Sequence, residues 1–173
     1  MSNCLFSLKA VANLVVVVQE DIGHASPEIY NSFPRKFGKD ALSVEDTIAT
    51  GFDSIFCYRR MTPAQKLLLD NLIVEFDHPA LTPAFLARQF ASLTTHHQSL
   101  VLILRALVKR PKLIILDECW SGLDSLGIAA TNRYLNTKLK DQALIMISHT
   151  EEELPRWTHA LTLQNGKVLK LLE

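Results

Sequence analysis

Two adjacent carboxylates that follow a run of four apolar residues form the densest chemical pattern in the sequence. The apolar run is Leu113–Leu116, and the acids are Asp117 and Glu118. Open α/β sheets bind ligands at the carboxyl ends of their strands, so a buried strand here would present both acids at a binding edge. There, an aspartate can hold Mg²⁺ through water, and a neighbouring glutamate can polarise the water that attacks a phosphate. The alternative is a strand that simply ends in solvated acids.

Further polar residues follow at spacings that fit the same edge. The segment Ser121–Asp124 begins two residues beyond the acids, and His149 comes 31 residues after Glu118, at the end of the next expected strand. Neighbouring parallel strands end at one edge of a sheet, so we expect His149 to lie beside the acids. A histidine at this position can donate a hydrogen bond to a phosphate oxygen, whereas a lone histidine is more often structural.

The second half of the chain alternates helical and strand patterns, which predicts an α/β layered fold with parallel strands. The connection between parallel strands needs a crossover, and a helix between the two apolar runs supplies it. We expect helices over 97–110 and 124–140, strands over 113–116 and 143–147, and a terminal hairpin whose strands, 160–163 and 167–171, flank Asn165-Gly166.

The first half carries one strand pattern and then mostly helical patterns. The β-branched run Val15–Val18 predicts a buried strand. Residues 22–40 contain two glycines and two prolines, which predict a loop with short turns. Helix-start signals then predict three helices: 44–50 capped by Ser43 or Asp46, 64–76 after Thr62-Pro63, and 84–90 opened by Pro83.

Length and composition exclude several classes of protein. The chain has 173 residues, which is about one domain, and its 18 Lys and Arg residues balance 18 Asp and Glu residues. We therefore expect no nucleic-acid partner, because such proteins carry a basic footprint. No apolar run approaches the ~20 residues of a membrane helix, so we expect no transmembrane segment. Three scattered cysteines give no disulfide framework and predict a reducing compartment: the cytoplasm, with a mitochondrial location as the alternative.

The order of these motifs carries a family resemblance. Residues 90–150 resemble the second half of an ATP-binding cassette (ABC) ATPase: Leu113–Glu118 is similar to its Walker B strand, Ser121–Asp124 to its D-loop and His149 to its switch histidine. Leu104–Val108 resembles the helix that follows the family signature. Weaker similarity extends backward. Ile22–Ser26 resembles the strand entering the Q-loop, and Gly51–Ile55 resembles a segment of soluble, non-transporter cassettes of the molybdate-associated type and their fungal relatives.

The resemblance implies a fold, a chemistry and a set of site residues. The implied fold is a P-loop NTPase-like, ABC-type α/β sheet that is incomplete at its N-terminus, with a helical subdomain at 41–96 and an α/β part at 97–173. The implied cofactors are ATP and Mg²⁺. Asp117 would hold Mg²⁺ through water, Glu118 would be the general base and His149 would sense the γ-phosphate. The residues implied to contact the nucleotide, besides Asp117, are Thr94, Thr95, Ser121 and Asp124.

The phosphate-binding Walker A loop of the family, GxxxxGK[ST], has no counterpart in this sequence. The only Gly-Lys pair is Gly38-Lys39, where the upstream glycine position holds Phe33 and the hydroxyl position holds Asp40. That loop cradles phosphates with its backbone N–H groups and its lysine. We therefore expect ATP to bind only if a partner or a missing N-terminal segment supplies the loop, and we expect the isolated chain to hydrolyse ATP weakly or not at all.

The family signature LSGGQ is also altered, to Leu93–His97, in which Thr95 and His96 replace the two glycines. These side chains should hinder the approach of a partner's γ-phosphate to the helix N-terminus, while Thr94 and Thr95 retain the ability to cap the helix. Adjacent histidines do not face one way on a helix, so we do not expect His96 and His97 to form a metal pair.

Two further positions depart from the family. Pro27 stands where the Q-loop has a glutamine, with Glu28 beside it as a candidate replacement at Mg²⁺. Cys119-Trp120 replaces a pair that usually contains proline. The sequence places no base beside Cys119, so we interpret this residue as a small apolar group and not as a nucleophile.

Two hypotheses from different classes follow. The first is an ATP-binding, ATP-hydrolysing piece of a soluble ABC-type protein, either a truncated gene product or half of a split cassette. The second is a non-catalytic interaction module or pseudo-ATPase that completes its sheet or its site with a protein partner, such as a cassette dimer. The mean hydropathy of +0.13 fits the second hypothesis, because an exposed apolar surface expects a partner.

Overall fold

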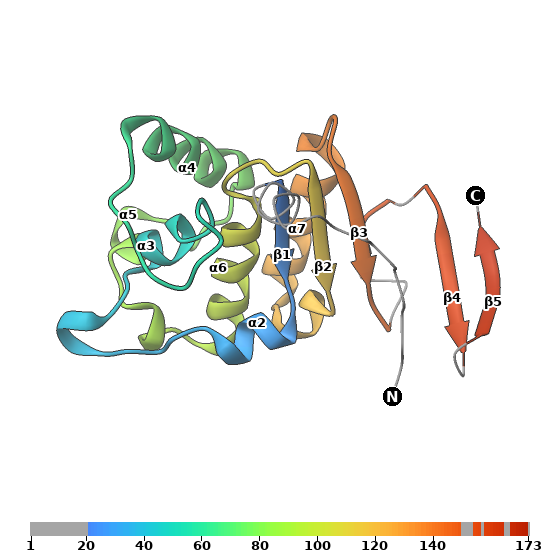
Figure 1. The fold of residues 1–173 in the computed structure, drawn as a ribbon, viewed down its shortest axis with the longest axis horizontal. Coiled ribbons are helices and arrows are strands. Elements are labelled where there is room, and N and C mark those ends of the chain that lie inside the picture. The colour runs from blue at the N-terminus through green and yellow to red at the C-terminus, as the bar shows by residue number, and fades with distance from the viewer. Residues whose placement is uncertain (1–20, 150–153, 157, 165–166, 173) are drawn as a thin grey trace, which may run out of the picture.

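The computed structural model describes residues 21–149, 154–156, 158–164 and 167–172 (Figure 1). The predicted strand Val15–Val18 and the predicted turn Asn165-Gly166 lie outside the described residues. No helix among the described residues is long and apolar enough to cross a membrane.

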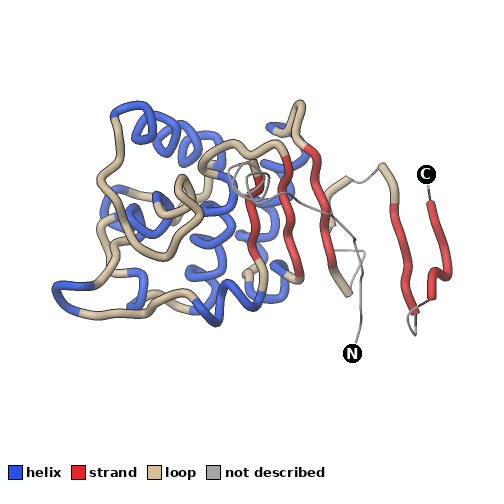
Figure 2. The backbone as a smooth tube through the Cα atoms, in the orientation of Figure 1, coloured by secondary structure: helices blue, strands red, loops and turns tan. Residues whose placement is uncertain are grey.

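Three parallel strands form the sheet, as the alternation of patterns predicts. They are β1 (Ile22–Ala25), β2 (Leu113–Asp117) and β3 (Ala143–Ile147), and they pair in the order β1-β2-β3. Figure 2 shows the three strands side by side, and both pairings are parallel. Because Asp117 pairs with Ile147, the register brings the ends of β2 and β3 to one edge.

A separate two-stranded sheet follows near the C-terminus. Strand β4 (Ala160–Gln164) pairs antiparallel with β5 (Lys167–Leu172), which confirms the predicted terminal hairpin strands. Among the described residues no strand ladder joins this pair to the three-stranded sheet, and Figure 1 draws it beyond β3.

The two helices of the second half begin and end close to their predicted bounds. Helix α6 (Thr95–Leu107) is buried along Leu100–Leu107 and packs against β1 and β2. A helix that is buried on most of its sides belongs inside a domain, and the stretch from Leu100 to Leu107 lies in the core. Helix α7 (Ser125–Lys138) connects β2 to β3 and provides the crossover that parallel pairing requires.

Local capping signals set the helices of the first half. Helix α3 (Val44–Ala49) starts at a capping box of Ser43 and Asp46, and α4 (Pro63–Phe76) starts at a second box that begins with Thr62. The predicted helix 84–90 is shorter, because α5 (Pro83–Leu86) ends where the chain turns to pair with the segment before α3. There, Val44 donates to the Arg88 carbonyl at 2.9 Å. A short 3-10 turn, η2 (Phe90–Ser92), follows.

The loop predicted over residues 22–40 is wrong, whereas the strand implied by the resemblance over 22–26 is confirmed. The segment contains β1, helix α2 (Pro27–Ser32) and the 3-10 turn η1 (Gly38–Asp40). Gly23 does not mark a turn: any side chain there would overlap the carbonyl oxygen of Ala106 on α6. Pro27 does not mark a loop either, because it occupies the first position of α2 after the N-cap Ser26.

One apolar core runs through the described part of the chain. It joins residues of α3 and α4, such as Ile48 and Leu72, to Leu104 of α6 and to Ile114 of β2. Between 41 and 96 the described chain forms helices and one isolated bridge, Ser43 to Gln89, and no other strand. The division into a helical subdomain and an α/β part remains a prediction.

Candidate functional site

The end of β2 brings the predicted catalytic pair together. Asp117 is the last residue of the strand, and Glu118 adopts a left-handed conformation with φ of 49°. The N–H of Glu118 donates to the Ile147 carbonyl at 2.9 Å, which ties this turn to the end of β3. As a result the Nε2 atom of His149 lies 2.7 Å from the Oε1 atom of Glu118. This is the contact expected from two parallel strands that end at one edge.

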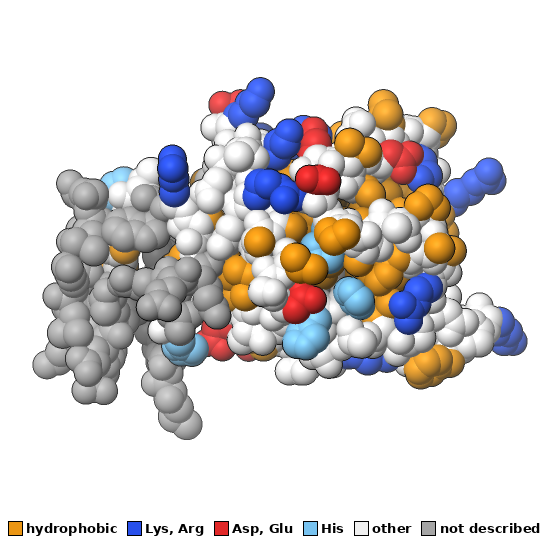
Figure 3. All heavy atoms as spheres, turned by 180° about the vertical axis from the view of Figure 1, so that it is seen from behind, with side chains coloured by type: hydrophobic (Ala, Val, Ile, Leu, Met, Phe, Trp, Pro, Cys, Tyr) orange, Lys and Arg blue, Asp and Glu red, His pale blue; other side chains and the backbone are white. Residues whose placement is uncertain are grey.

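Negative charge gathers at this edge. Burial raises the pKa of Asp117, and the charges of Glu118 and Glu28 raise it further, while His24 and His149 oppose the shift. Figure 3 shows histidine and acidic side chains close together near the lower edge of the rear face, the edge at which the strands end. A cation bound at this edge would relieve the repulsion among the carboxylates.

The residues at this edge fit a Mg²⁺ ion that is bound by a single carboxylate through water. Among the described residues, no group of three or more His, Cys, Asp or Glu side chains is arranged to hold a metal ion. Magnesium does not need such a cage, because it keeps several waters and binds through one or two carboxylates and substrate phosphates. Asp117 therefore fits as a single carboxylate that acts through water, and the remaining ligands would come from water and nucleotide.

Pro27, at the position of the Q-loop glutamine, is the first residue of helix α2. Ser26 accepts a hydrogen bond from the Ile29 N–H at 3.3 Å, and Pro27 begins α2. Glu28 is exposed in the first turn, where hydrogen bonds from the backbone and from Ser26 lower its pKa. Glu28 contributes charge to the same edge as Asp117, but its role as a replacement for glutamine remains a prediction.

The D-loop residues have structural contacts. In the 3-10 turn η3 (Cys119–Gly122), the Ser121 hydroxyl donates to the Glu118 carbonyl at 3.0 Å. Asp124 caps α7 by accepting from the Gly127 N–H at 2.8 Å. Both residues therefore support the chain around Glu118, and their contact with a nucleotide remains a prediction.

The residues of the altered signature form the start of helix α6. Thr94 is the N-cap of α6 and accepts from the His97 N–H at 3.5 Å, and Thr95 is the first helical residue. The two histidines face different partners: Nδ1 of His97 lies 3.2 Å from the Thr94 hydroxyl, and Nδ1 of His96 lies 3.2 Å from the Gly122 carbonyl. The last contact places the start of α6 beside the D-loop. Whether Thr94 and Thr95 contact a nucleotide remains a prediction.

The surroundings of the Cys119 thiol agree with its interpretation as a small packing residue. Its sulfur donates to the carbonyl of Ala25 at 3.2 Å, which links β1 to the turn after β2. Burial raises the pKa of this thiol to about 12, so the nucleophilic thiolate is disfavoured at neutral pH. Trp120 beside it is a core residue whose indole N–H donates to the Asn132 side chain at 3.1 Å.

Gln98 of α6 is among the buried polar residues to which sequence reasoning assigned no role. Its Oε1 accepts from the Tyr30 hydroxyl and from the Nε of Arg35, both at 3.1 Å. Its amide nitrogen donates to the carbonyls of Phe90 and Leu93 at 3.2 and 3.4 Å. Gln98 thus joins helix α2, which follows the Q-loop position, to the backbone of the signature segment. Gln98 stands among the polar residues that precede the apolar run of α6, so no sequence pattern marked it as buried.

Comparisons with known proteins show which proteins the chain is similar to. No family model matches the chain. An uncharacterized ABC transporter ATP-binding protein of Schizosaccharomyces pombe is 30% identical over 154 residues, which is 88% of this chain and 30% of that protein. The ABC transporter ATP-binding protein ModF of Escherichia coli is 30% identical over 148 residues, 83% of this chain and 29% of ModF.

Solved structures agree in fold. The dimeric structure of the bacterial ABC transporter cassette MJ0796 matches with a TM-score of 0.67 at 17% identity, covering 93% of this chain and 66% of that one. Its post-hydrolysis state bound to ADP and Pi matches with a TM-score of 0.69 at 17% identity, covering 95% of this chain and 68% of that one. The chain is homologous to part of an ATP-binding cassette. This partial cassette has the P-loop NTPase-like fold, and it spans about 30% of the length of the curated relatives described above.

Proposed function

We propose that this partial cassette forms the carboxylate half of an ATP-hydrolysing site, and that another segment supplies the phosphate-binding half. The observation that carries the proposal is the contact of 2.7 Å between Glu118 and His149, beside Asp117, at the carboxyl ends of two parallel strands. This is the edge at which α/β sheets bind their ligands. The half-site has carboxylates for a metal and a base, but no loop among the described residues that could hold phosphates.

In this proposal each residue has a separate task. Bound Mg²⁺ would supply charge neutralisation at the phosphates. Asp117 would hold that ion through water, in the place where burial and neighbouring acids already disfavour an uncompensated charge. The left-handed turn and the Ile147 carbonyl fix the direction of Glu118, and His149 holds Oε1. Oε2 is then the oxygen that would accept the proton of the attacking water.

The edge of β3 is the place where the second half would join. Ile145 and Ile147 on this strand are 50% and 47% exposed, which is high for apolar residues of a parallel sheet. A strand that paired with the edge of β3 that no other described strand occupies would end next to His149 and could deliver a phosphate-binding loop there. This strand would come from a longer form of the protein or from a partner cassette. The dimeric neighbours support an assembly of cassettes.

Hydrolysis by a completed cassette tests the proposal. We would fuse residues 21–173 behind the Walker A half of the MJ0796 cassette, at the equivalent point before β1, and measure Mg²⁺-dependent ATP hydrolysis. We expect turnover that Glu118→Gln lowers by ~10²–10⁴-fold, the range attributed to a general base. Asp70→Asn, an exposed carboxylate on α4, is the matched control and should keep the turnover. Turnover that is equal in Glu118→Gln and in the parent fusion would contradict the proposal.

A second candidate function, a non-catalytic partner of another cassette, rests on the signature segment. Thr95 and His96 place side chains where a close backbone approach needs glycine. In this version the chain completes the sheet of its partner but does not activate the partner's nucleotide. A fusion that binds Mg²⁺-ATP but shows no turnover would favour it. In both versions the use of ATP makes the cytoplasm the proposed location.

A further inference from the structure

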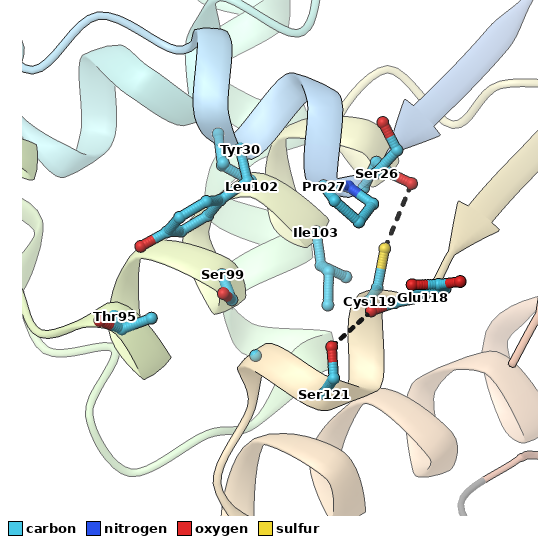
Figure 4. Close-up of a pocket in the computed structure, with 12 residues that line it drawn as sticks. Ser26, Pro27, Tyr30, Thr95, Ser99, Leu102, Ile103, Glu118, Cys119 and Ser121 are labelled. Atoms are coloured by element: carbon cyan, nitrogen blue, oxygen red, sulfur yellow. Dashed lines mark hydrogen bonds between the residues drawn. The ribbon is translucent and has the colours of Figure 1, made fainter. Parts of the chain in front are cut away.

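A cavity of about 130 Å³ lies beside Glu118 and Cys119, which are both among the residues that line it (Figure 4). Three segments form its walls: the start of α2, the first turns of α6, and η3. Its apolar surface comes from the Pro27 and Tyr30 rings and from Ile103, with Cys119 opposite. The cavity therefore touches the Q-loop position, the signature helix and the turn that leads into the D-loop.

Two of the hydroxyls that line the cavity, those of Ser99 and Thr95, are available for a hydrogen bond, and Ser99 is the less exposed of the two. Ser121 already donates to the Glu118 carbonyl, and the Cys119 thiol already donates to the carbonyl of Ala25. The Ser99 hydroxyl, which lines the same space, has no hydrogen-bond partner within the described part of the chain. A half-buried hydroxyl beside an apolar wall gains by accepting from or donating to a bound molecule.

The volume limits what can occupy this space. Pockets for nucleotides and drug-sized ligands usually measure ~300–1,000 Å³, so this cavity is too small for them. A dry apolar cavity of ~150 Å³ is known to bind benzene in another protein. From the volume, the apolar walls and the unpaired hydroxyl of Ser99, we infer that the cavity binds a small apolar molecule that carries a hydrogen-bonding group. Indole has the appropriate size and chemistry to serve as a probe.

Such a ligand would act on the relative positions of the three segments. It would contact α2, α6 and η3 at once. Near the cavity, η3 meets α6 where Gly122 approaches Ser99 and His96, and Tyr30 of α2 donates to Gln98 of α6. We expect bound indole to slow amide hydrogen exchange in 26–32, 98–103 and 119–122 and to leave α4 unchanged. This effect does not depend on ATP, so it stands apart from the proposed function.

Filling the cavity is the first test. Titration of the chain with indole, followed by nuclear magnetic resonance shifts of the Leu102 and Ile103 methyl groups, should saturate. Cys119→Met extends a side chain into the space and should weaken binding at least tenfold. Cys57→Met makes the same exchange at an exposed cysteine and should leave binding unchanged. An unsaturable titration, or wild-type affinity in Cys119→Met, would overturn the inference.

Removing the hydroxyl is the second test, and it does not strain the fold because alanine is a good helix residue at position 99. Ser99→Ala should weaken the binding of indole by ~3–10-fold, which corresponds to one neutral hydrogen bond. The affinity for indene, which has the same shape but no N–H group, should stay unchanged. Equal affinities of indole for Ser99→Ala and the parent chain would contradict the assigned polar contact.

Discussion

Two regions of the molecule differ in which atoms would carry their chemistry. One is the edge where β2 and β3 end, at Asp117 and Ile147, and the other is the signature segment 93–97 at the start of α6. At the strand ends, side chains carry the chemistry: Glu118 and His149 meet at 2.7 Å, with Asp117 beside them. In the signature segment the family's chemistry belongs to the backbone, which glycines leave open. Here Thr94 caps α6, and the ring of His96 lies 3.2 Å from the Gly122 carbonyl, so side chains cover that backbone.

The comparison shows that chemistry carried by side chains can be recognised from residue types, whereas access to the backbone cannot. A carboxylate or an imidazole keeps its chemistry wherever the fold places it, so Asp117, Glu118 and His149 mark a site by their identity. Replacing a glycine removes access to a helix N-terminus and leaves a helix of normal stability in its place. Under the proposed function, the chain therefore has the side chains that would activate water, but side chains cover the backbone that would approach a partner's phosphate.

The largest expected effect concerns the support of the sheet edge. Gly23→Ala would place a methyl group against the Ala106 carbonyl oxygen and close to Pro111, and backbone cannot yield there. We expect a loss of about 3 kcal/mol or more in the free energy of unfolding, measured by urea denaturation. Gly38→Ala is the matched control: it has a positive φ of 73° but open space, and it should lose only about 1 kcal/mol. Equal losses would show that the contact with α6 is unimportant.

The next effect concerns the support of the signature segment. Gln98→Leu keeps the volume of the side chain but leaves Tyr30, Arg35 and two carbonyls without their partner. Unpaired buried groups cost ~1–3 kcal/mol, so we expect a loss of about 2 kcal/mol. Hydrogen exchange should locate this loss: we expect the amides of residues 90–94 to exchange faster, while those of β2 and β3 stay protected. Faster exchange throughout the chain would instead make Gln98 an ordinary core residue.

A smaller effect would sharpen the comparison directly. The double change Thr95→Gly and His96→Gly restores the open backbone and should cost ~1–2 kcal/mol, because glycine is a poor helix residue. In the fusion with a Walker A half, the same change should raise ATP turnover. The single change His97→Gln, one residue further along α6, is the control and should not. Unchanged turnover in the double variant would show that the side chains at 95 and 96 do not limit the site.

The smallest expected effect is a gain in stability at the end of β2. The pKa of Asp117 is raised from its usual 3.8, so the folded chain disfavours the charged form. A raised carboxyl pKa costs stability as the pH rises from 3.8 through the folded-state value, and that cost persists at neutral pH. Asp117→Asn should therefore raise the urea midpoint at pH 7, with a gain that vanishes below about pH 3.8. A lower midpoint at pH 7 would contradict the electrostatic account.

Local signals explain most of what the sequence predicts correctly. The capping residues Ser43 and Thr62 set helix starts, and the apolar runs of β2 and β3 predict strands whose shared edge brings Glu118 to His149. Gly23 and Pro27 misled the prediction, because their roles depend on a carbonyl of α6 and on a helix start. Gln98 could not be predicted, since its partners Tyr30 and Arg35 lie 68 and 63 residues away in the chain.

Calorimetric titration with Mg²⁺-ATP tests the central claim most directly, namely that this chain holds the carboxylate half of a site and depends on another segment for phosphate binding. The account predicts no micromolar binding to residues 1–173 alone, and micromolar binding to the fusion with a Walker A half that Asp117→Asn weakens. Micromolar binding to the chain alone, lost in Asp117→Asn, would contradict it, because a complete site would then exist without the added loop.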